Sequence, residues 1–587
     1  MAEGSTVNPA LKPSKTEVVK LASDYLRAHI LDDLGGPGGS ITEDSATILK
    51  FHGSYQQDDR DVRAERKKEK LEKDFQFMVR VRMPGGKCTA AQYLACDALC
   101  QTVGNQSLRI TTRQEFQLHG VLKKDLKTTI RTVNEVLLST LAACGDVERN
   151  VLSCPAPIHD GVRAAMQADC DAFTAHFAPR SSAYWEIWMD GEKVDNPLLP
   201  TQGPALVPTA GDDPVESIYG KTYMSRKFKT GFALPDDNCT DVFANDLGFI
   251  ARVEAGQLVG YHVVVGGGLG TTPSAAKTFP ALAQSLTTVA RGDILRVGEA
   301  IVKVTRDFGN RVDRKRARLK YLLYDWGIPA FRAKVEEYLG HSLPDPIPFQ
   351  VSEVHDHMGW HPQGDGRFWL GLPVDSGRIL DSGSVRLLSG LRAIFRRFGT
   401  PARMTCQQSI LLIDLEPGWK QEIESMLEEY GIATVERIST VRRWAMACPA
   451  LPTCGLAVTE AERALPGVLT ALEKTLDDLG LGAQRFTVRM TGCPNGCARP
   501  YNADIGLVGR SAGKGEVDGI YAGTYTIFLG GSTLGHQLNG LYKDYVPYQA
   551  IVEELTPVLR RFRDERQPGE GLGEFCRRAG LVQEADT

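Results

Sequence analysis

The alternation of apolar and polar residues predicts a β-strand at residues 75–86, FQFMVRVRMPGG. The next segment, TAAQYLACDALCQTVG, has apolar residues at the spacing of a helix, and SLRITTRQEFQLHGV returns to the composition of strands. We therefore predict a strand–helix–strand unit in this part of the chain.

The same order of predicted elements occurs a second time, in RFWLGLPVDSGRI, SVRLLSGLRAIFRRFG and ARMTCQQSILLIDL. Three further pairs of segments correspond in the same order: NVLSCPAPIHDGVRAA with MACPALPTCGLAVTEAERAL, RKFKTGFAL with VRMTGCPNGCARPYNADIGL, and GQLVGYHVVVGGGLG with GIYAGTYTIFLGGSTLG. Such self-similarity indicates an internal duplication. We expect two similar halves, residues 75–335 and 355–570, to pack around a pseudo-twofold axis.

The first 45 or so residues are rich in Gly, Ser, Pro and charged residues and have one helical pattern, from Val18 to Leu31. The segment FHGSYQQDDRDVRAERKKEKLEKD follows with dense charge of both signs, which is typical of a solvated helix or loop. We interpret this part of the chain as an N-terminal arm.

Length and composition narrow the class of protein. A chain of 587 residues is too long for one hydrophobic core and predicts about three to five domains. The net charge of −4 and the pI near 6.3 argue against a general nucleic-acid binder. There is neither an apolar run of about 18 residues nor a signal-peptide core, so we expect a cytoplasmic protein without membrane spans. Thirteen cysteines without a secretory signal favour a reducing compartment and metal ligation over disulfides.

Four of the cysteines form two pairs, in ACPALPTC and TGCPNGCARPY. Cys448 and Cys454 have C-x5-C spacing, and Cys493 and Cys497 have C-x3-C spacing. Four thiolates from two loops are the ligand set of a cubane iron–sulfur cluster. Zinc is the rival metal, but its structural sites usually have tighter cysteine pairs. Ordinary buried cysteines are the third alternative.

Basic residues recur on the predicted strands. Arg80 and Arg82 share one strand face, and Lys227 and Lys229 share another, because strand side chains alternate with a period of two. Each of them alone is best explained as a surface charge. As a group they could bind an anion, and arginine is suited to bidentate contacts with carboxylates.

Glycine-rich turns could indicate a nucleotide site, but their spacing does not fit one. Gly266, Gly268 and Thr271 do not complete G-x-G-x-x-G, and GKT at 220–222 has Val215 where a phosphate loop needs glycine. We find no sequence motif for FAD or a nicotinamide cofactor. We expect these turns to let the backbone approach a bound cofactor closely or to make tight joints between a strand and a helix.

The segment HDHMGWH, residues 355–361, has three histidines within seven positions and could be a metal site. It lies at the junction between the two halves and has no acidic or thiol partner at a fixed spacing. We therefore favour an ordinary junction without a metal.

The two cysteine segments resemble the cluster motifs of the sirohaem-dependent nitrite and sulfite reductase family, and the resemblance extends from about Phe51 to Leu581. It implies a [4Fe-4S] cluster on Cys448, Cys454, Cys493 and Cys497, and sirohaem with Cys497 axial to its iron. It also implies that only the second half carries the cluster cysteines.

The resemblance further implies which residues surround the cofactors. Arg80, Arg149, Lys227 and Lys229 match the residues around the anion at the sirohaem iron. The positions that match contacts to sirohaem or support for the cluster are Arg109, Thr111, Arg113, Gln117, His119, Asn310, Arg311 and Asn495. For Arg82 the resemblance implies one of two roles, contact with the macrocycle or packing beneath it.

The fold implied is α+β, with duplicated ferredoxin-like and α/β modules around a central sirohaem and [4Fe-4S] site. The expected domains are an N-terminal arm (1–74), a first ferredoxin-like half-domain (75–145), a sirohaem-side α/β domain (146–345), a second ferredoxin-like half-domain (346–425) and a cluster-binding α/β domain (426–587).

The implied activity is the six-electron reduction of sulfite to sulfide for sulfur assimilation, as in the assimilatory sulfite reductase haemoproteins of this family. Electrons would come from an NADPH-dependent flavoprotein subunit or from ferredoxin. Two alternatives stay open: a ferredoxin-dependent nitrite reductase that forms ammonia, and a non-catalytic cluster or tetrapyrrole carrier. Lys229 favours sulfite, because the nitrite reductases of the family typically have asparagine there.

Overall fold

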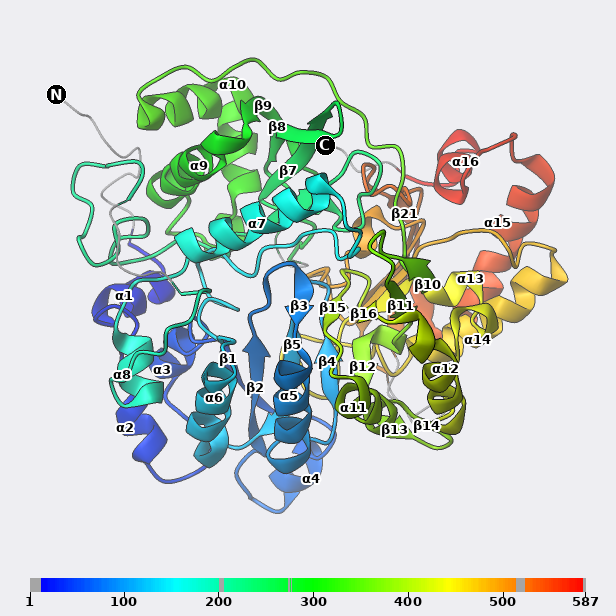
Figure 1. Ribbon diagram of the computed structural model, residues 1–587, viewed down its shortest axis with the longest axis horizontal. Helices are drawn as coiled ribbons and strands as arrows, with labels where there is room; N and C mark the ends of the chain where they lie inside the picture. The colour runs from blue at the N-terminus through cyan, green and yellow to red at the C-terminus, as the bar shows by residue number, and fades with distance from the viewer. Residues whose placement is uncertain (1–11, 200–204, 273–274, 276, 514–522, 584–587) are drawn as a thin grey trace.

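Two five-stranded sheets adjoin each other in the computed structural model, which describes residues 12–199, 205–272, 275, 277–513 and 523–583 (Figure 1). The first sheet has the order β1 (Ser54–Asp58), β2 (Phe75–Val81), β5 (Phe116–Val121), β4 (Leu108–Ile110) and β12 (Arg378–Ile379). The second has the order β10 (Gly359–Pro362), β11 (Phe368–Leu372), β16 (Ile410–Leu415), β15 (Ala402–Met404) and β3 (Lys87–Cys88). The duplicated ferredoxin-like half-domains are thereby confirmed.

The two half-domains exchange a short strand. β3 belongs to the first half but pairs with β15 of the second, with Cys88 opposite Ala402. In return, β12 of the second half pairs with β4 of the first, with Arg378 opposite Arg109. Each half thus supplies the last strand of the other half's sheet, and the two exchanged strands are related by the pseudo-twofold axis.

One pair of helices covers each sheet: α5 (Ala90–Thr102) and α6 (Leu126–Glu135) the first, and α11 (Leu387–Phe398) and α12 (Lys420–Glu429) the second (Figure 1). The helices α5 and α11 pack against each other across the pseudo-twofold axis. The ring centroids of Tyr93 and Phe395 lie 4.0 Å apart, and Arg392 Nε is 2.6 Å from Asp97 Oδ2.

A four-stranded and a five-stranded sheet complete the halves. The first has β6 (Thr230–Ala233), β7 (Leu247–Glu254), β8 (Gln257–Val265) and β9 (Gln284–Ala290), and the second has β17 (Ala445–Ala447), β18 (Val488–Thr491), β19 (Ile505–Ser511), β20 (Thr524–Leu529) and β21 (Gly540–Pro547). β6 pairs with β7 in parallel, as β18 does with β19, and antiparallel strands follow in both. The counterpart of β17 in the first half is reduced to isolated parallel bridges at Glu148 and Leu152.

Helices and two short strands make up the rest of both halves. They are α7 (Gly161–His176), α8 (Ala183–Met189), α9 (Ile294–Phe308), α10 (Leu319–Leu339), β13 (Asp381–Ser382), β14 (Val385–Arg386), α13 (Thr440–Arg443), α14 (Leu465–Asp478), α15 (Ile551–Glu565) and α16 (Leu572–Arg578). Within the described ranges, none of the helices has both the length and the apolar character needed to cross a lipid bilayer.

The N-terminal arm contains α1 (Lys15–Ala22), α2 (Ile30–Gly35), α3 (Glu43–Ile48) and α4 (Arg63–Lys68). The prediction of one helix from Val18 to Leu31 was wrong, because Asp24, Tyr25, Leu26 and Ala28 have positive φ. The segment of residues 24–28, between α1 and α2, is held by tertiary contacts, such as the 2.8 Å hydrogen bond between a ring nitrogen of His52 and the Leu26 carbonyl. The helix α4 buries no residue, so the predicted solvated segment is confirmed there, but its first residues, among them Phe51, His52 and Ser54, are buried. β1 also lies within the expected arm, although it is the edge strand of the first sheet.

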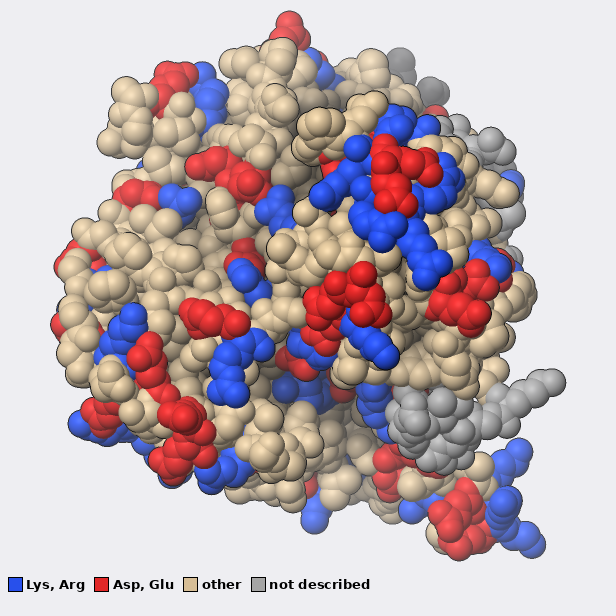
Figure 2. All heavy atoms as spheres, turned by 90° about the vertical axis from the view of Figure 1, so that its right-hand side faces the viewer, with Lys and Arg blue, Asp and Glu red and all other residues tan. Residues whose placement is uncertain are grey.

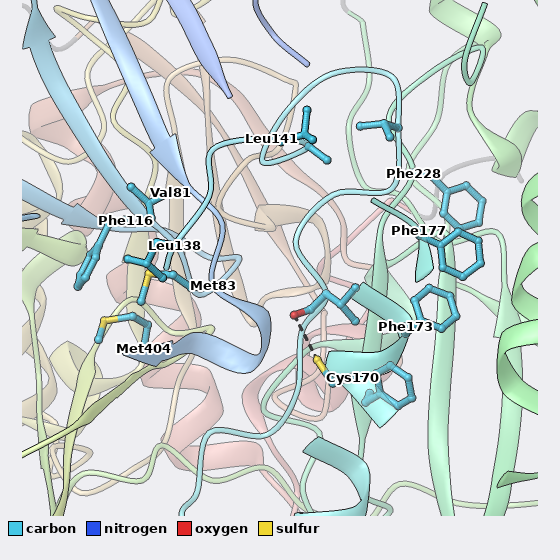
Figure 3. Packing of buried hydrophobic residues seen from close by; sticks show 14 of the residues in the cluster. Val81, Met83, Phe116, Leu138, Leu141, Cys170, Phe173, Phe177, Phe228 and Met404 are labelled. Atoms are coloured by element: carbon cyan, nitrogen blue, oxygen red, sulfur yellow. Dashed lines mark hydrogen bonds between the residues drawn. The ribbon is translucent and has the colours of Figure 1, made fainter. Parts of the chain in front are cut away.

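The hydrophobic core is shared by both halves. In Figure 3, Met404 of the second half lies beside Met83, Val81 and other residues of the first. On the other side of the same view, Phe228 lies next to Phe177 and Phe173. Phe228 is buried and therefore anchors the segment RKFKT to the core, with a lysine on each side of it.

Charges of both signs are interspersed on the face that Figure 2 shows, which includes the helices α15 and α16. Ion pairs on these two helices join Arg561 to Glu565, Arg563 to Asp564, and Arg578 to Glu570.

Candidate functional site

Two of the four predicted ligand cysteines follow neighbouring parallel strands. Cys448 comes directly after β17, and Cys493 lies two residues after β18. The strands pair with Ala447 opposite Met490, so their carboxyl ends meet at one edge of the sheet. The backbone N–H of Gly492 donates to Cys448 Sγ at 3.4 Å, which joins the two loops at the sulfur itself.

The other two cysteines lie near enough to complete the set. Burial raises the pKa of Cys448 and Cys454, and the pKa of Cys493 to about 11; repulsion by Cys497 adds to each rise. The thiols of Cys448, Cys454 and Cys493 therefore need a cation to become thiolates. Over the part of the chain that the structure describes, these four sulfurs do not form a group compact enough for a single ion. This separation fits a cluster better than zinc.

Residues of the first half and of the arm hold the cluster loops. Arg109 Nη2 donates to the Ala447 carbonyl at 2.8 Å, and Thr112 Oγ1 donates to the Cys497 carbonyl at 3.2 Å. From the arm, Arg60 Nη1 donates to the Cys454 carbonyl at 3.2 Å. The cluster loops are thus positioned by contacts between the halves.

The glycine-rich turn after β8 packs against the second cysteine loop. A Cβ on Gly270 would lie 2.7 Å from the Asn495 carbonyl oxygen, so a side chain there would push the loop away. Next to it, the Thr271 N–H donates to the Pro494 carbonyl at 2.9 Å. This turn makes a close backbone approach, and its partner is the cysteine loop; the expected approach to a bound cofactor stays a prediction.

One cavity brings together residues that the sequence placed in a common site. The predicted residues that line it are Arg113, Lys227, Lys229, Asn495 and Cys497. The remaining lining residues are Thr112, Ala244, Asn245, Leu269, Gly270, Arg318, Gly496 and Arg499. A cysteine of the cluster set therefore faces the same space as a group of cations from the first half.

The two lysines of RKFKT are held in a strongly cationic environment. Burial lowers the pKa of Lys227 and Lys229 well below the ordinary value, and repulsion by Arg149 and Arg318 lowers both further. Arg149 is placed beside them by the backbone, because its N–H donates to the Phe228 carbonyl at 3.1 Å. An anion in the cavity would stabilise the charged form of both lysines.

Arg80 reaches the same region from β2. Despite burial, its pKa is raised by the nearby Cys144 and Glu115 and, to a smaller extent, by Cys497. Arg80 Nε lies 3.7 Å from Glu115 Oε2, and the Gln117 amide oxygen, when oriented toward it, accepts from Nε at 3.1 Å. Burial raises the pKa of Glu115 to about 7, although the positive charge of Arg80 acts to lower it.

Several buried polar atoms of the first sheet and of the turn between β4 and β5 lack hydrogen-bond partners among the described residues. Both ring nitrogens of His119, Nε of Arg109 and Nε of Arg113 make no hydrogen bond. Burial lowers the pKa of Arg109 and of Arg113 to about 10. Buried donors are normally satisfied, and a polycarboxylate such as sirohaem supplies acceptors for them. The residues present therefore fit this cofactor.

The other predicted cofactor residues have different surroundings. Thr111 orders the turn between β4 and β5, where its Oγ1 accepts from the N–H groups of Arg113 and Glu115. Asn310 and Arg311 do not line the cavity. Asn310 Oδ1 accepts from two N–H groups of its own turn, and Arg311 pairs with Glu17 of the arm. Arg80, Arg109, Thr111, Gln117, His119 and Arg149 do not line the cavity either, so the contacts of all these residues with a cofactor or anion stay predictions.

Three residues in or near the site were not singled out from the sequence. Arg318 lines the cavity and is held by Asp246, with 2.6 Å between Nη2 and Oδ2. Tyr55 of β1 accepts from Arg149 Nη2 at 3.5 Å, and Glu115 neighbours Arg80. The basic run RKRARLK could have pointed to Arg318, whereas Tyr55 and Glu115 have no local signal.

Comparisons with known proteins agree with this site. The model of the nitrite and sulphite reductase 4Fe-4S domain matches residues 171–343, and that of the nitrite/sulfite reductase ferredoxin-like half domain matches 69–136 and 361–430. The match to residues 171–343 falls on the first half, whereas the four cysteines lie in the second. The two halves are duplicates, so the matched part of the first half corresponds to the part of the second half that carries the cysteines.

Curated relatives extend the match to almost the whole chain. A "Sulfite reductase [NADPH] hemoprotein beta-component" of Myxococcus xanthus is 44% identical, with 97% of each chain covered. A "Sulfite reductase [ferredoxin]" of Synechococcus elongatus is also 44% identical, with 97% of this chain and 90% of the relative covered. The solved structure of the Mycobacterium tuberculosis NirA protein superimposes with a TM-score of 0.77 at 26% identity, with 97% of both chains covered. The chain belongs to the nitrite and sulfite reductase family.

Proposed function

We propose that the protein is an assimilatory sulfite reductase haemoprotein, which reduces sulfite to sulfide with six electrons. The observation that carries the proposal is the cavity in which Cys497 faces Lys227, Lys229 and other cations. A carrier of electrons or tetrapyrrole has no use for such a group of charges beside an open iron position. Relatives named as sulfite reductases support the same activity.

Two sets of residues would hold the cofactors. Cys448, Cys454, Cys493 and Cys497 would bind the [4Fe-4S] cluster, and Cys497 would also hold the sirohaem. Arg109, Arg113, His119 and Asn495 would contact sirohaem or support the cluster. When bound, these groups supply the electrons and an iron to which the sulfur of sulfite can bind.

Cations in and beside the cavity would bind and orient the substrate: Lys227 and Lys229 line it, whereas Arg80 and Arg149 lie outside its lining. Arg80, Arg149, Lys227 and Lys229 would neutralise the oxyanion and hold its oxygens at fixed positions. As an S–O bond breaks, the leaving oxygen must gain protons to depart as water. The lowered pKa of Lys227 and Lys229 makes their ammonium groups good proton donors for this step.

The electron donor is proposed to be a separate protein, either an NADPH-dependent flavoprotein subunit or ferredoxin. Relatives with similar identity are named after each of these two donors, so similarity does not choose between them. A reducing, cytoplasmic compartment fits the thirteen cysteines, all of which are described and free of disulfides.

The experiment is an anaerobic assay of the holoenzyme with sulfite or nitrite. It is supplied in turn with reduced ferredoxin, with NADPH plus the flavoprotein, and with NADPH alone. We expect sulfide from sulfite with one protein donor, a higher kcat/KM for sulfite than for nitrite, and no turnover with NADPH alone. A higher kcat/KM for nitrite would replace the proposal by nitrite reduction. No reaction with either anion, together with haem bands that sulfite leaves unchanged, would indicate a carrier.

A further inference from the structure

A second cysteine-containing cluster lies in the first half, away from the cavity lined by Cys497. Cys154, Asp237, Cys239 and His357 are all buried, and one ligand atom of each lies within 4.8 Å of those of the other three. Three separate segments of the chain meet here. His357 belongs to the histidine-rich junction of residues 355–361, where the sequence showed no acidic or thiol partner at a fixed spacing. The fold brings such partners to His357 from other segments.

Three of the four ligand atoms have separations near those of a tetrahedral site, and the sulfur of Cys239 lies within 4.8 Å of each. Asp237 Oδ2 lies 3.0 Å from Cys154 Sγ and 3.1 Å from His357 Nε2, and the last two atoms are 3.9 Å apart. Tetrahedral zinc with bonds of about 2.0–2.3 Å separates its ligand atoms by about 3.3–3.8 Å. Small side-chain rotations would therefore bring the four atoms around one ion.

The backbone orients the carboxylate and the imidazole toward the centre. Asp237 Oδ1 accepts from the N–H groups of Cys239 and His355, so Oδ2 is the oxygen left to face the cluster. His357 has φ of +61°, a conformation that is uncommon for residues other than glycine. The junction also pairs with the turn before Cys239, because the Asn238 N–H donates to the Glu353 carbonyl at 3.0 Å.

The internal duplication relates this cluster to the four predicted iron–sulfur ligands. Gln114 exchanges hydrogen bonds with both backbone groups of Ser153, as Gln408 does with those of Ala447. Ser153 and Ala447 each precede a cysteine, which makes Cys154 the counterpart of Cys448.

The second cysteine of the cluster also has a counterpart. Two residues after Cys239 and after Cys497, Asp241 and Arg499 take a left-handed conformation and begin short 3-10 helices. Cys239 therefore corresponds to Cys497, and the first half retains two of the four cysteine positions.

From this geometry we propose that Cys154, Asp237, Cys239 and His357 bind one structural zinc ion. Two thiolates and an imidazole are ligands that favour zinc over calcium or magnesium, which prefer oxygen. Four protein ligands in a buried position leave no open coordination site, as in structural rather than catalytic zinc sites. The ion would fasten the junction between the halves to the turn after β6, and β6 directly follows Lys229. This inference does not depend on the proposed activity.

The test is the metal content of the purified holoenzyme, measured after removal of loosely bound metal with a chelator. We expect about one zinc per chain besides the iron of the cofactors, and X-ray absorption at the zinc edge with two sulfur ligands near about 2.3 Å and two lighter ligands near about 2.0 Å. Cys239→Ser and His357→Ala should lower the zinc content at least fivefold and leave iron unchanged. Cys576→Ser, a matched change at a buried cysteine of α16, should keep the zinc.

Three results would overturn the proposal. The first is wild-type protein without zinc, both as isolated and after equilibration with zinc salts under reducing conditions. The second is zinc that persists in both ligand variants or has four sulfur neighbours, since it would then occupy the cluster cysteines. The third is a disulfide between Cys154 and Cys239 in the purified holoenzyme, detected by mass spectrometry, because the sulfurs could not then bind the ion.

Discussion

Arg109 of the first half donates a hydrogen bond from Nη2 to the carbonyl oxygen of Ala447 in the second, at 2.8 Å. Ala447 is the last residue of β17 and precedes Cys448, so the guanidinium of a first-half strand supports the start of the cluster loop. The same Nη2 also donates to the Ser376 carbonyl at 3.0 Å, and Nη1 lies 3.0 Å from Glu462 Oε2. One buried side chain thus joins three segments of the second half.

We predict that Arg109→Met destabilises the protein and loosens the cluster. The Ser376 carbonyl loses its Arg109 donor and Glu462 loses one of its two arginines, which should cost about 1–3 kcal/mol. Calorimetry should show a lower Tm, and iron analysis a faster loss of iron during dialysis. The control is Arg397→Met, which breaks an exposed pair with Glu422 and should change stability by less than about 1 kcal/mol. Equal effects of the two variants would contradict the assigned role of Arg109.

Cys497→Ser should abolish the coupling between the haem and the cluster, and not only lower the cluster occupancy. Cys497 is the exposed cysteine of the four and lines the cavity, whereas Cys454 does not. We expect Cys497→Ser to lose the spectroscopic coupling between haem and cluster, and Cys454→Ser to lower cluster occupancy. Electron paramagnetic resonance and iron analysis distinguish the two results, with Cys576→Ser as the unaffected control. Intact coupling in the Cys497→Ser protein would remove the bridge assignment.

Lys229→Asn should shift the preference from sulfite toward nitrite. Sulfite carries more negative charge than nitrite, so it gains more from Lys229 as a fourth cation besides Arg80, Arg149 and Lys227. Loss of one such contact, about 1.5–3 kcal/mol, lowers kcat/KM for sulfite about ten- to hundredfold and spares or raises that for nitrite. The control is Lys221→Asn, at an exposed position in the preceding loop. An equal fall for both anions would mean that Lys229 supports the fold or the haem instead.

The pH dependence of sulfite binding should also report on Lys229. Because burial lowers the pKa of Lys229, its ammonium loses the proton at a lower pH than an ordinary lysine does. The cationic form exists below that pKa, so sulfite binding should weaken as the pH rises through it. Lys229→Arg keeps its charge, and its KM for sulfite should rise less than that of the wild type between about pH 7 and 10. Since both proteins face the same titrating substrate, parallel KM profiles would contradict the prediction.

Much of the fold follows from local pattern. The strand at Phe75, the helix that became α5 and the repeated segments of the second half were predicted from periodicity, because burial on one face imposes it on the sequence. The four cluster cysteines were likewise recognised, because a metal cluster requires thiolates and leaves a distinct spacing.

Other features had no local signal. The helix predicted from Val18 to Leu31 ends at Ala22 because distant residues such as His52 hold the next loop. Tyr55 and Glu115 reach the candidate site only through the pairing of the first sheet. Asn310 was expected in the site and lies in a turn outside the cavity.

By itself the sequence determined the duplication, the four cysteines in the second half and the basic residues that a bound anion would need. Only the tertiary structure decided that the halves exchange β3 and β12, and that Cys154, Asp237, Cys239 and His357 meet. The physical reason is range. Periodicity and ligand spacing act over a few neighbouring residues, whereas strand exchange and the convergence of His357 with Cys154 depend on where the folded chain brings segments far apart in sequence.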